Sequence, residues 1–168
     1  QDVKKGESTT VSNSDASQKL TVATSSAALN LQVSGNLGNV ALNTLTTLSI
    51  EGTNSKDVAA LQKLIDDGVS GIARDGTNGN KFNITTAIDL SSINLDNAKI
   101  TSNAAAGSFT STATDKLVIK NNSESKIVLS NIDAKSASKL DALKNLQAGD
   151  LTAKVASDYQ AVVNDAIS

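Results

Sequence analysis

The residues best suited to chemistry in this sequence are the oxygen-bearing side chains of one short polar segment, Asp75 to Asn80 (DGTNGN). Asp75, Asn78 and Asn80 could act as metal ligands there, because calcium prefers several hard oxygen atoms supplied by a flexible turn. The segment departs from the EF-hand loop: Gly79 stands where that loop has Asp or Asn, and no glutamate follows at its twelfth position. These three residues are therefore candidate calcium ligands. The alternative is an ordinary turn, which such residues commonly build.

Other kinds of catalytic chemistry lack their usual residues. The 168 residues include no histidine, cysteine, methionine, tryptophan or proline, and only Phe82, Phe109 and Tyr159 are aromatic. Acid–base work would therefore depend on carboxylates alone, and zinc sites built from Cys and His are excluded. The sequence contains no GxSxG, P-loop or dinucleotide-binding motif. We expect a protein that is not an enzyme.

Charge and hydropathy argue against nucleic acid and membrane as partners. A net charge of −2 and a pI near 5.0 give no basic patch, and the aromatic platforms that stack bases are missing. No stretch approaches the roughly 18 to 20 consecutive apolar residues that a membrane-spanning helix needs. No hydrophobic signal segment is present either, so an export signal would have been removed or would lie outside this sequence.

Two sequons, Asn83-Ile84-Thr85 and Asn121-Asn122-Ser123, could accept N-linked glycans. They would be used only if the producing cell has the machinery for this modification. The alternative is chance, because a chain rich in Asn, Ser and Thr contains such triplets often.

Polar residues dominate the first part of the chain, and short apolar patterns follow it. Residues 1–18 predict a flexible polar N-terminal arm that is a tail, a linker or an exposed first strand. Residues 19–168 predict a single β-rich domain with helices. Period-two alternation of apolar residues indicates strands with one buried face. The predicted strand-like runs are Leu20 to Val22, Leu29 to Val33, Val40 to Leu42, Phe82 to Ile84, Ala87 to Leu95, Lys99 to Thr101, Ser108 to Thr112, Lys116 to Lys120 and Lys126 to Ile132.

Helical patterns occur at three places. Ser55 is a suitable N-cap for a helix whose apolar stripe includes Leu61 and Leu64 and which ends at Gly68. Ser136 or Ser138 begins a second helix, ended by Gly149, and Thr152 begins a third. The fold class expected is mixed α+β and β-rich, with short strands in a sandwich or a solenoid-like arrangement and two or three amphipathic helices.

Two features of the pattern leave alternatives open. The run Val40 to Gly52 mixes spacings of three and two, so it predicts either a corner between strands of a solenoid or one bent strand. A shift of 82 residues places Ile50 on Ile132 and Leu61 on Leu143. This weak echo indicates either two repeated halves or the general likeness of strand-to-helix units.

The segments LNTLTTLSIEG, SKDVAALQKLIDDG and KLVIKNNSESKIVLSNIDAKSASKLDALKNL together resemble the repetitive segments of bacterial S-layer proteins and large secreted adhesins. Those proteins are free of cysteine, rich in Thr and Asn, and often exported by a type I system. The resemblance is one of texture and covers about Leu20 to Ser168. It implies a calcium-tolerant, β-rich extracellular protein of the cell surface. The glycine-aspartate calcium repeat of many such proteins (GGxGxDxxx) is missing here.

The function expected is that of a structural surface module, S-layer-like or filament-like, which self-assembles through backbone strand pairing and apolar contacts. Exposed strand edges or the arm at residues 1–18 would join neighbouring copies. One alternative is a carbohydrate-binding or carbohydrate-cleaving adhesin or β-helix domain, with cell-surface glycans as partners. Another is an engineered or phage fibre segment, which would form trimers.

Overall fold

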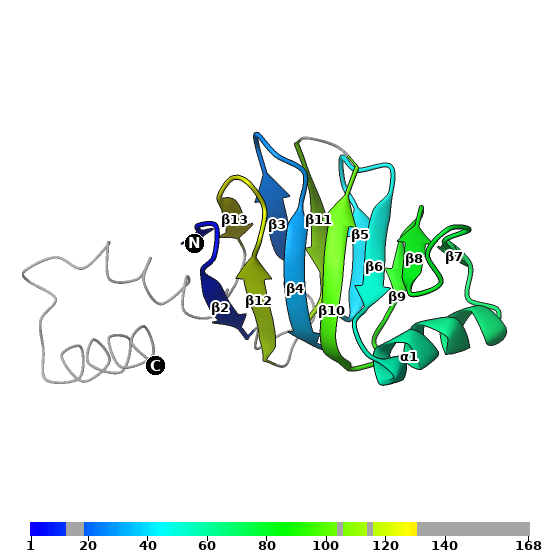
Figure 1. Ribbon diagram of the computed structural model, residues 1–168. Coiled ribbons are helices and arrows are strands. Elements are labelled where there is room, and N and C mark those ends of the chain that lie inside the picture. The colour runs from blue at the N-terminus through cyan, green and yellow to red at the C-terminus, as the bar shows by residue number, and fades with distance from the viewer. Residues whose placement is uncertain (13–18, 104–105, 114–115, 131–168) are drawn as a thin grey trace, which may run out of the picture. The chain divides into compact units, whose positions relative to one another are not determined.

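The computed structural model describes residues 1–12, 19–103, 106–113 and 116–130, which all belong to the unit Gln1–Ile132. Within these residues the strands form two antiparallel sheets that face each other (Figure 1). The first sheet contains, in spatial order, β1 (Asp2–Val3), β13 (Ile127–Ser130), β3 (Leu20–Thr24), β11 (Gly107–Ser111), β5 (Asn39–Leu42) and β9 (Ile88–Asp89). The second sheet contains β2 (Ser8–Val11), β12 (Leu117–Asn121), β4 (Asn30–Gly35), β10 (Leu95–Ser102), β6 (Leu48–Gly52), β8 (Lys81–Ile84) and β7 (Ile72–Arg74).

The strand pairing is that of one long hairpin rolled up on itself. β1 pairs with β13, β2 with β12, β3 with β11, β4 with β10, β5 with β9 and β6 with β8. Along each arm of this hairpin successive strands alternate between the two sheets, which is the jelly-roll arrangement. The helix α1 (Ser55–Asp66) and β7 form its tip. The two expected arrangements were a sandwich and a solenoid, and the structure is a sandwich.

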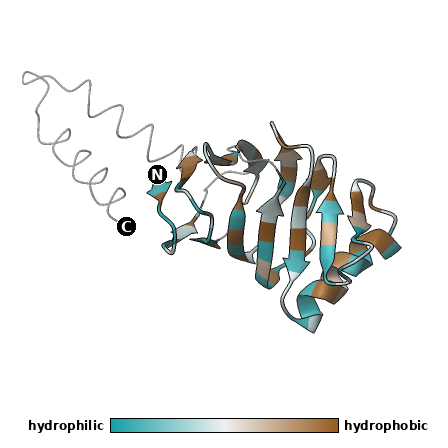
Figure 2. Cartoon of the chain, turned by 45° about the horizontal axis from the view of Figure 1, so that its top comes forward, coloured by the Kyte–Doolittle hydropathy of each residue, from teal (hydrophilic) through white to brown (hydrophobic). Residues whose placement is uncertain are grey.

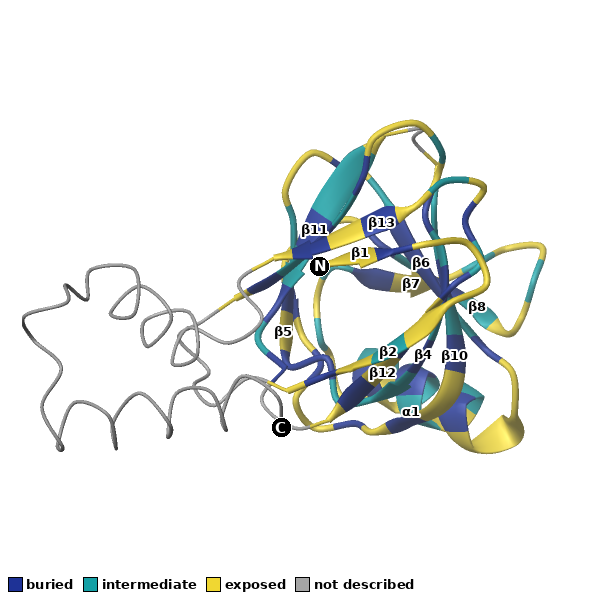
Figure 3. Ribbon diagram, turned by 90° about the vertical axis from the view of Figure 1, so that its left-hand side faces the viewer, coloured by how far each residue is buried: buried dark blue, intermediate teal, exposed yellow. Residues whose placement is uncertain are grey.

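The core lies between the sheets and is almost entirely aliphatic. Buried residues alternate with half-buried ones along β3 and with exposed ones along β12, as period two predicts. Figure 2 shows the resulting bands of hydropathy across the strands, and Figure 3 shows buried positions on both layers. Phe82 and Phe109, 0% and 1% exposed, are the two aromatic residues of this core.

The helix predicted before Gly68 is confirmed, with a different N-cap. Asn54, not Ser55, caps it: the Asn54 Oδ1 accepts the backbone N–H of Asp57 at 2.9 Å. Leu61 and Leu64 are buried, and α1 lies against β6 and β10 (Figure 1). It is the one helix of the described residues. The helices predicted from Ser136 or Ser138 and from Thr152, and the second half of the repeat, lie outside them.

Two strand predictions need correction. The run Val40 to Gly52 is neither a solenoid corner nor one bent strand, because β5 and β6 belong to opposite sheets and a loop joins them. The run Ala87 to Leu95 is not one strand, since β9 covers only Ile88–Asp89 and β10 begins at Leu95. Asp89 explains the break: its Oδ1 accepts the backbone N–H of Ser91 at 2.9 Å and turns the chain.

The first twelve residues belong to the sandwich. The sequence predicted a flexible arm that is a tail, a linker or an exposed first strand, and the structure shows edge strands here. Asp2 pairs with Val128 and Thr9 pairs with Ile119, so this segment contributes an edge strand to each sheet. The amino group of Gln1 also donates to the carbonyl of Leu129 at 2.7 Å. Val3 and Val11 are 2% and 1% exposed, and their burial holds the segment in place. Residues 13–18 of the predicted arm lie outside the described residues.

Candidate functional site

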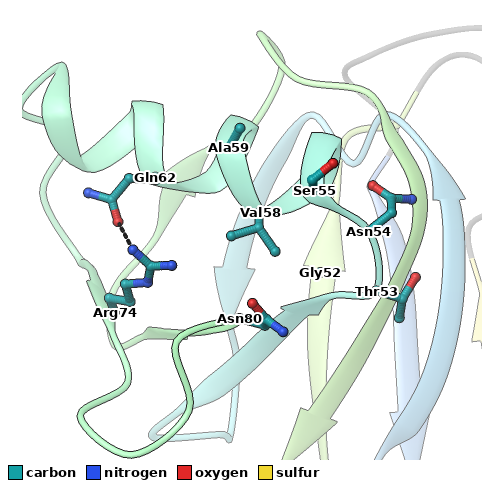
Figure 4. Close-up of a pocket in the computed structure, with 9 residues that line it drawn as sticks. All are labelled: Gly52, Thr53, Asn54, Ser55, Val58, Ala59, Gln62, Arg74 and Asn80. Carbon is teal, nitrogen blue, oxygen red and sulfur yellow. Dashed lines mark hydrogen bonds between the residues drawn. The ribbon is translucent and has the colours of Figure 1, made fainter.

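A groove of about 510 Å³ lies beside the first turns of α1 (Figure 4). Its volume is within the range of small-molecule sites, roughly 300 to 1,000 Å³. Among the residues that the structure describes, no carboxylate lines it. The lining residues come from the end of β6, from α1, from β7 and from the loop before β8: Gly52, Thr53, Asn54, Ser55, Val58, Ala59, Gln62, Arg74 and Asn80.

Arg74 is the one charged group among the described residues of this groove, and it is the single arginine among the 15 basic residues of the chain. Its Nε donates to the carbonyl of Gly79 at 2.5 Å, and its Nη1 donates to Gln62 Oε1 at 3.3 Å (Figure 4). The guanidinium carbon lies 5.6 Å from the centroid of the Phe82 ring, within range of a cation–π interaction. These contacts fix the plane of the guanidinium. Among the described residues, Arg74 has no carboxylate partner within ion-pair distance.

A close approach of α1 to β6 forms the apolar floor of the groove. A Cβ at Gly52 would lie 2.7 Å from Cγ2 of Val58 and 2.9 Å from its backbone nitrogen, so only glycine fits there. The backbone N–H of Gly52 donates to the carbonyl of Asn80 at 2.9 Å, which ties the loop before β8 to the end of β6. The groove is therefore set by backbone contacts and does not depend on one mobile side chain.

The structure places the candidate calcium ligands in the hairpin loop between β7 and β8. Asp75 Oδ1 accepts from the N–H of Thr77 at 2.9 Å and from the N–H of Asn78 at 3.1 Å. Asn78 Oδ1 in turn accepts from the N–H of Asn80 at 3.0 Å. The loop thus links all three residues, but through hydrogen bonds to its own backbone, and a cation would have to displace these donors. Calcium binding at Asp75, Asn78 and Asn80 stays a prediction.

The same hydrogen bonds act on the charge of Asp75. The backbone N–H of Thr77 and then the side-chain amide of Asn83 favour the carboxylate, and together with the other loop donors they hold the pKa of Asp75 far below its ordinary value of 3.8. Asp75 is therefore ionised across the whole physiological range. Among the described residues, no group of three or more Asp and Glu is arranged to hold a metal ion.

Both sequon asparagines have engaged side chains. Asn121 is 0% exposed, and its Nδ2 donates to the carbonyls of Val3 and Ser125, each at 2.9 Å. Asn83 Nδ2 donates to Asp75 Oδ2 at 3.1 Å on the outer face of the second sheet. The folded domain therefore encloses the nitrogen of Asn121 that a glycan would need, whereas Asn83 is only partly buried.

Sequence reasoning identified one groove residue, Asn80, and assigned it to calcium. It missed Arg74, although the presence of a single arginine beside 14 lysines is visible in the sequence. It could not find the rest of the groove, because Gly52, Arg74 and Asn80 come together only through the register of β6, β7 and β8.

The fold and the site define a two-sheet jelly-roll domain with a small groove, which contains one arginine among its described residues, at the tip of its hairpin. No protein family, curated protein or solved structure matches this chain. Among the described residues, no helix is long and apolar enough to cross a membrane.

Proposed function

We propose that this chain is a non-catalytic structural module of a bacterial cell surface that associates with copies of itself by strand addition. The edge of the second sheet at β2 supports the proposal most directly. Its four residues, Ser8-Thr9-Thr10-Val11, make β2 the longest edge strand of the described residues, since β1 and β9 have two residues each and β7 has three.

The composition of β2 is that of an unprotected edge. Edge strands usually avoid unwanted pairing through charged residues, proline, bulges or very short length. β2 contains no charged residue and no proline, and it pairs with β12 in unbroken register from Ser8 to Val11. Threonine and valine also favour extended backbone.

The direction of the backbone groups follows from the ladder. The N–H of Asn121 donates to the carbonyl of Glu7 at 2.9 Å, and alternate residues of an antiparallel strand bond to the same neighbour. Thr9 and Val11 therefore face β12, while Ser8 and Thr10 direct their N–H and C=O groups away from the sheet. These outward groups would pair with a partner strand.

A second copy of β2 is the partner that fits. Antiparallel pairing of two β2 strands around a two-fold axis is self-complementary, and it continues the second sheet from one copy to the next. Such assembly needs no special side chain, which agrees with the plain composition of the chain. The resemblance to S-layer and adhesin segments supports the same extracellular setting.

Sedimentation velocity over a range of protein concentrations tests this proposal. Thr10→Pro removes an outward N–H and leaves the ladder to β12 intact, so we expect the variant to stay folded and monomeric where the unmodified protein associates. Val128→Lys alters an exposed residue on the other sheet and should leave association unchanged. Association of Thr10→Pro at the unmodified strength would rule out the β2 edge, and a protein that is monomeric at every concentration would refute the proposal.

Carbohydrate binding is the alternative expected from the sequence. The groove beside α1 favours it, and this groove is a different surface from the β2 edge.

A further inference from the structure

We propose that the groove beside α1 binds an acidic saccharide, that is, a sugar that carries a carboxylate. This inference concerns a different surface from the β2 edge and does not depend on self-association. It rests on three features of one concave site, as far as the described residues show: a guanidinium without a carboxylate partner, polar side chains without hydrogen bonds, and an apolar floor.

The guanidinium of Arg74 would bind the carboxylate. Arginine forms parallel hydrogen bonds to a planar carboxylate, which the ammonium group of lysine cannot do. Gly79 and Gln62 take one N–H group each, from Nε and from Nη1. The second N–H of Nη1 and both N–H groups of Nη2 therefore make no hydrogen bond in the described part of the chain, and these two nitrogens can donate in parallel to a carboxylate. The stacking of Arg74 on Phe82 keeps the group in place before a ligand arrives.

The neighbouring polar side chains suit the hydroxyl groups of a sugar. Within the described residues, no hydrogen bond engages the side chains of Ser55 and Asn80, and both line the groove (Figure 4). A hydroxyl and an amide each offer both a donor and an acceptor, as sugar hydroxyls do. Val58 and Ala59 add a small apolar surface against which the C–H face of a sugar ring can pack.

The same lining disfavours other anionic ligands. A nucleotide base would need an aromatic platform, and the aromatic rings of the described residues, Phe82 and Phe109, are buried in the core. Arg74 is the one cationic side chain among the described residues of the groove, which matches one carboxylate better than a multiply charged phosphate chain. The described lining residues also include no carboxylate that would repel an acidic ligand.

A nuclear magnetic resonance titration tests the proposal directly, because the single arginine gives a single Nε–H side-chain signal. The probes are the trisaccharide of galacturonic acid, the neutral trisaccharide of galactose and sodium acetate. We expect the acidic trisaccharide to shift the Arg74 Nε–H and the Asn80 side-chain amide in a saturable manner. The neutral trisaccharide should bind at least about tenfold more weakly, since it lacks the charge-assisted hydrogen bonds.

Variants distinguish binding in the groove from a general effect of the charge of the protein. Arg74→Gln should weaken binding of the acidic trisaccharide at least about tenfold, and Arg74→Lys should restore only part of it. Lys99→Gln, which removes the same charge from the outer face of the second sheet, should leave the affinity unchanged. If the arginine variants prove unstable, Asn80→Ala keeps the test available. The Asn80 side chain makes no hydrogen bond to another described residue, so its loss should weaken binding without unfolding the domain.

Three outcomes would overturn the proposal. Equal affinity for the neutral and acidic trisaccharides would show that the carboxylate is not recognised. Equal affinity for acetate would show an unselective anion site, not a saccharide site. Saturable binding that Arg74→Gln and Asn80→Ala both leave intact would place the ligand elsewhere.

Discussion

Asp57 Oδ2 accepts a hydrogen bond from the backbone N–H of Asn97 at 2.9 Å, although 40 residues separate them in the chain. Its Oδ1 accepts the N–H of Asp96 at the same distance. Asp96 and Asn97 lie where the register of β10 against β4 shifts, so they have no partner residue in that ladder. A buried carboxylate on α1, 0% exposed, replaces the missing strand partners and fixes the helix to the sheet.

Asp57→Asn tests this role. The amide keeps one acceptor and directs its NH₂ group at a backbone donor, so one N–H becomes buried without a partner. We expect the free energy of unfolding to fall by about 2 kcal/mol or more, measured by urea denaturation. Asp66→Asn makes the same chemical change at an exposed position of the same helix and should stay within about 0.5 kcal/mol of the unmodified protein. Equal effects of the two variants would contradict the structural role of Asp57.

Asn121 is a second buried polar residue whose loss should be costly. Its amide bonds to Val3, Ser125 and the N–H of Ser123, and thereby joins β12, the turn after it and the N-terminal strand. Asn121→Ala should lower the free energy of unfolding by about 2 to 4 kcal/mol, because several buried groups lose their partner. Asn122→Ala is the matched control: its side chain makes one long bond, 3.4 Å to Gln32, and should cost less than about 1 kcal/mol. A small effect of Asn121→Ala in chemical denaturation would contradict this view.

Sequence patterns located individual elements better than their arrangement. Period two predicted β3 and β4, and the spacing of Leu61 and Leu64 predicted α1, because local burial of one face determines these patterns. The sequence did not single out Asp57, and it offered Asn121 only as a glycan acceptor, because the backbone groups that these side chains bind at Asn97 and Val3 lie 40 and 118 residues away in the chain. The pairing of β1 with β13 could not be predicted for the same reason, because it joins segments from opposite ends of the hairpin that the sequence does not place together.

Gly35 has a backbone conformation that other residues rarely adopt. Its φ is +130°, and a Cβ there would lie 2.8 Å from the carbonyl oxygen of Lys116, a backbone atom that cannot easily move. Gly35→Ala should destabilise the domain by about 1 to 3 kcal/mol. Gly76→Ala, for which a Cβ would meet nothing within 4 Å, should be neutral or slightly stabilising. Thermal unfolding of both variants measures this difference in stability. Equal melting temperatures would contradict the strain that a side chain is expected to cause at Gly35.

The hydrogen bonds of the Asp75 loop should make the stability of the domain depend on pH. Because hydrogen bonds lower the pKa of Asp75 in the folded state, its stabilising effect is complete above the unfolded-state value near 3.8 and is lost as the pH falls below it. The melting temperature of Asp75→Asn should therefore be lower than that of the unmodified protein at pH 7, and the two should converge below pH 3.8.

Calcium addition separates the two roles expected of this loop. If the loop is an ordinary turn, neither calcium nor a chelator changes the difference in melting temperature between Asp75→Asn and the unmodified protein. We expect this result, because the loop's own N–H groups already donate to Asp75 and Asn78. A melting temperature that rises with calcium in the unmodified protein, and not in Asp75→Asn, would establish the metal site.

Deletion of residues 1–12 tests the jelly-roll pairing at the ends of the chain. The deletion removes β1 and β2, so it uncovers β13 in one sheet and β12 in the other. Two new strand edges and the lost burial of Val3 and Val11 should lower the melting temperature and increase aggregation. A free arm would give the opposite result, since its removal would leave stability unchanged. Addition of a synthetic peptide of residues 1–12 should restore the melting temperature of the shortened protein in a concentration-dependent manner, because the peptide can pair again with both edges. A peptide carrying Thr9→Pro, which removes an N–H that faces β12, should restore it less.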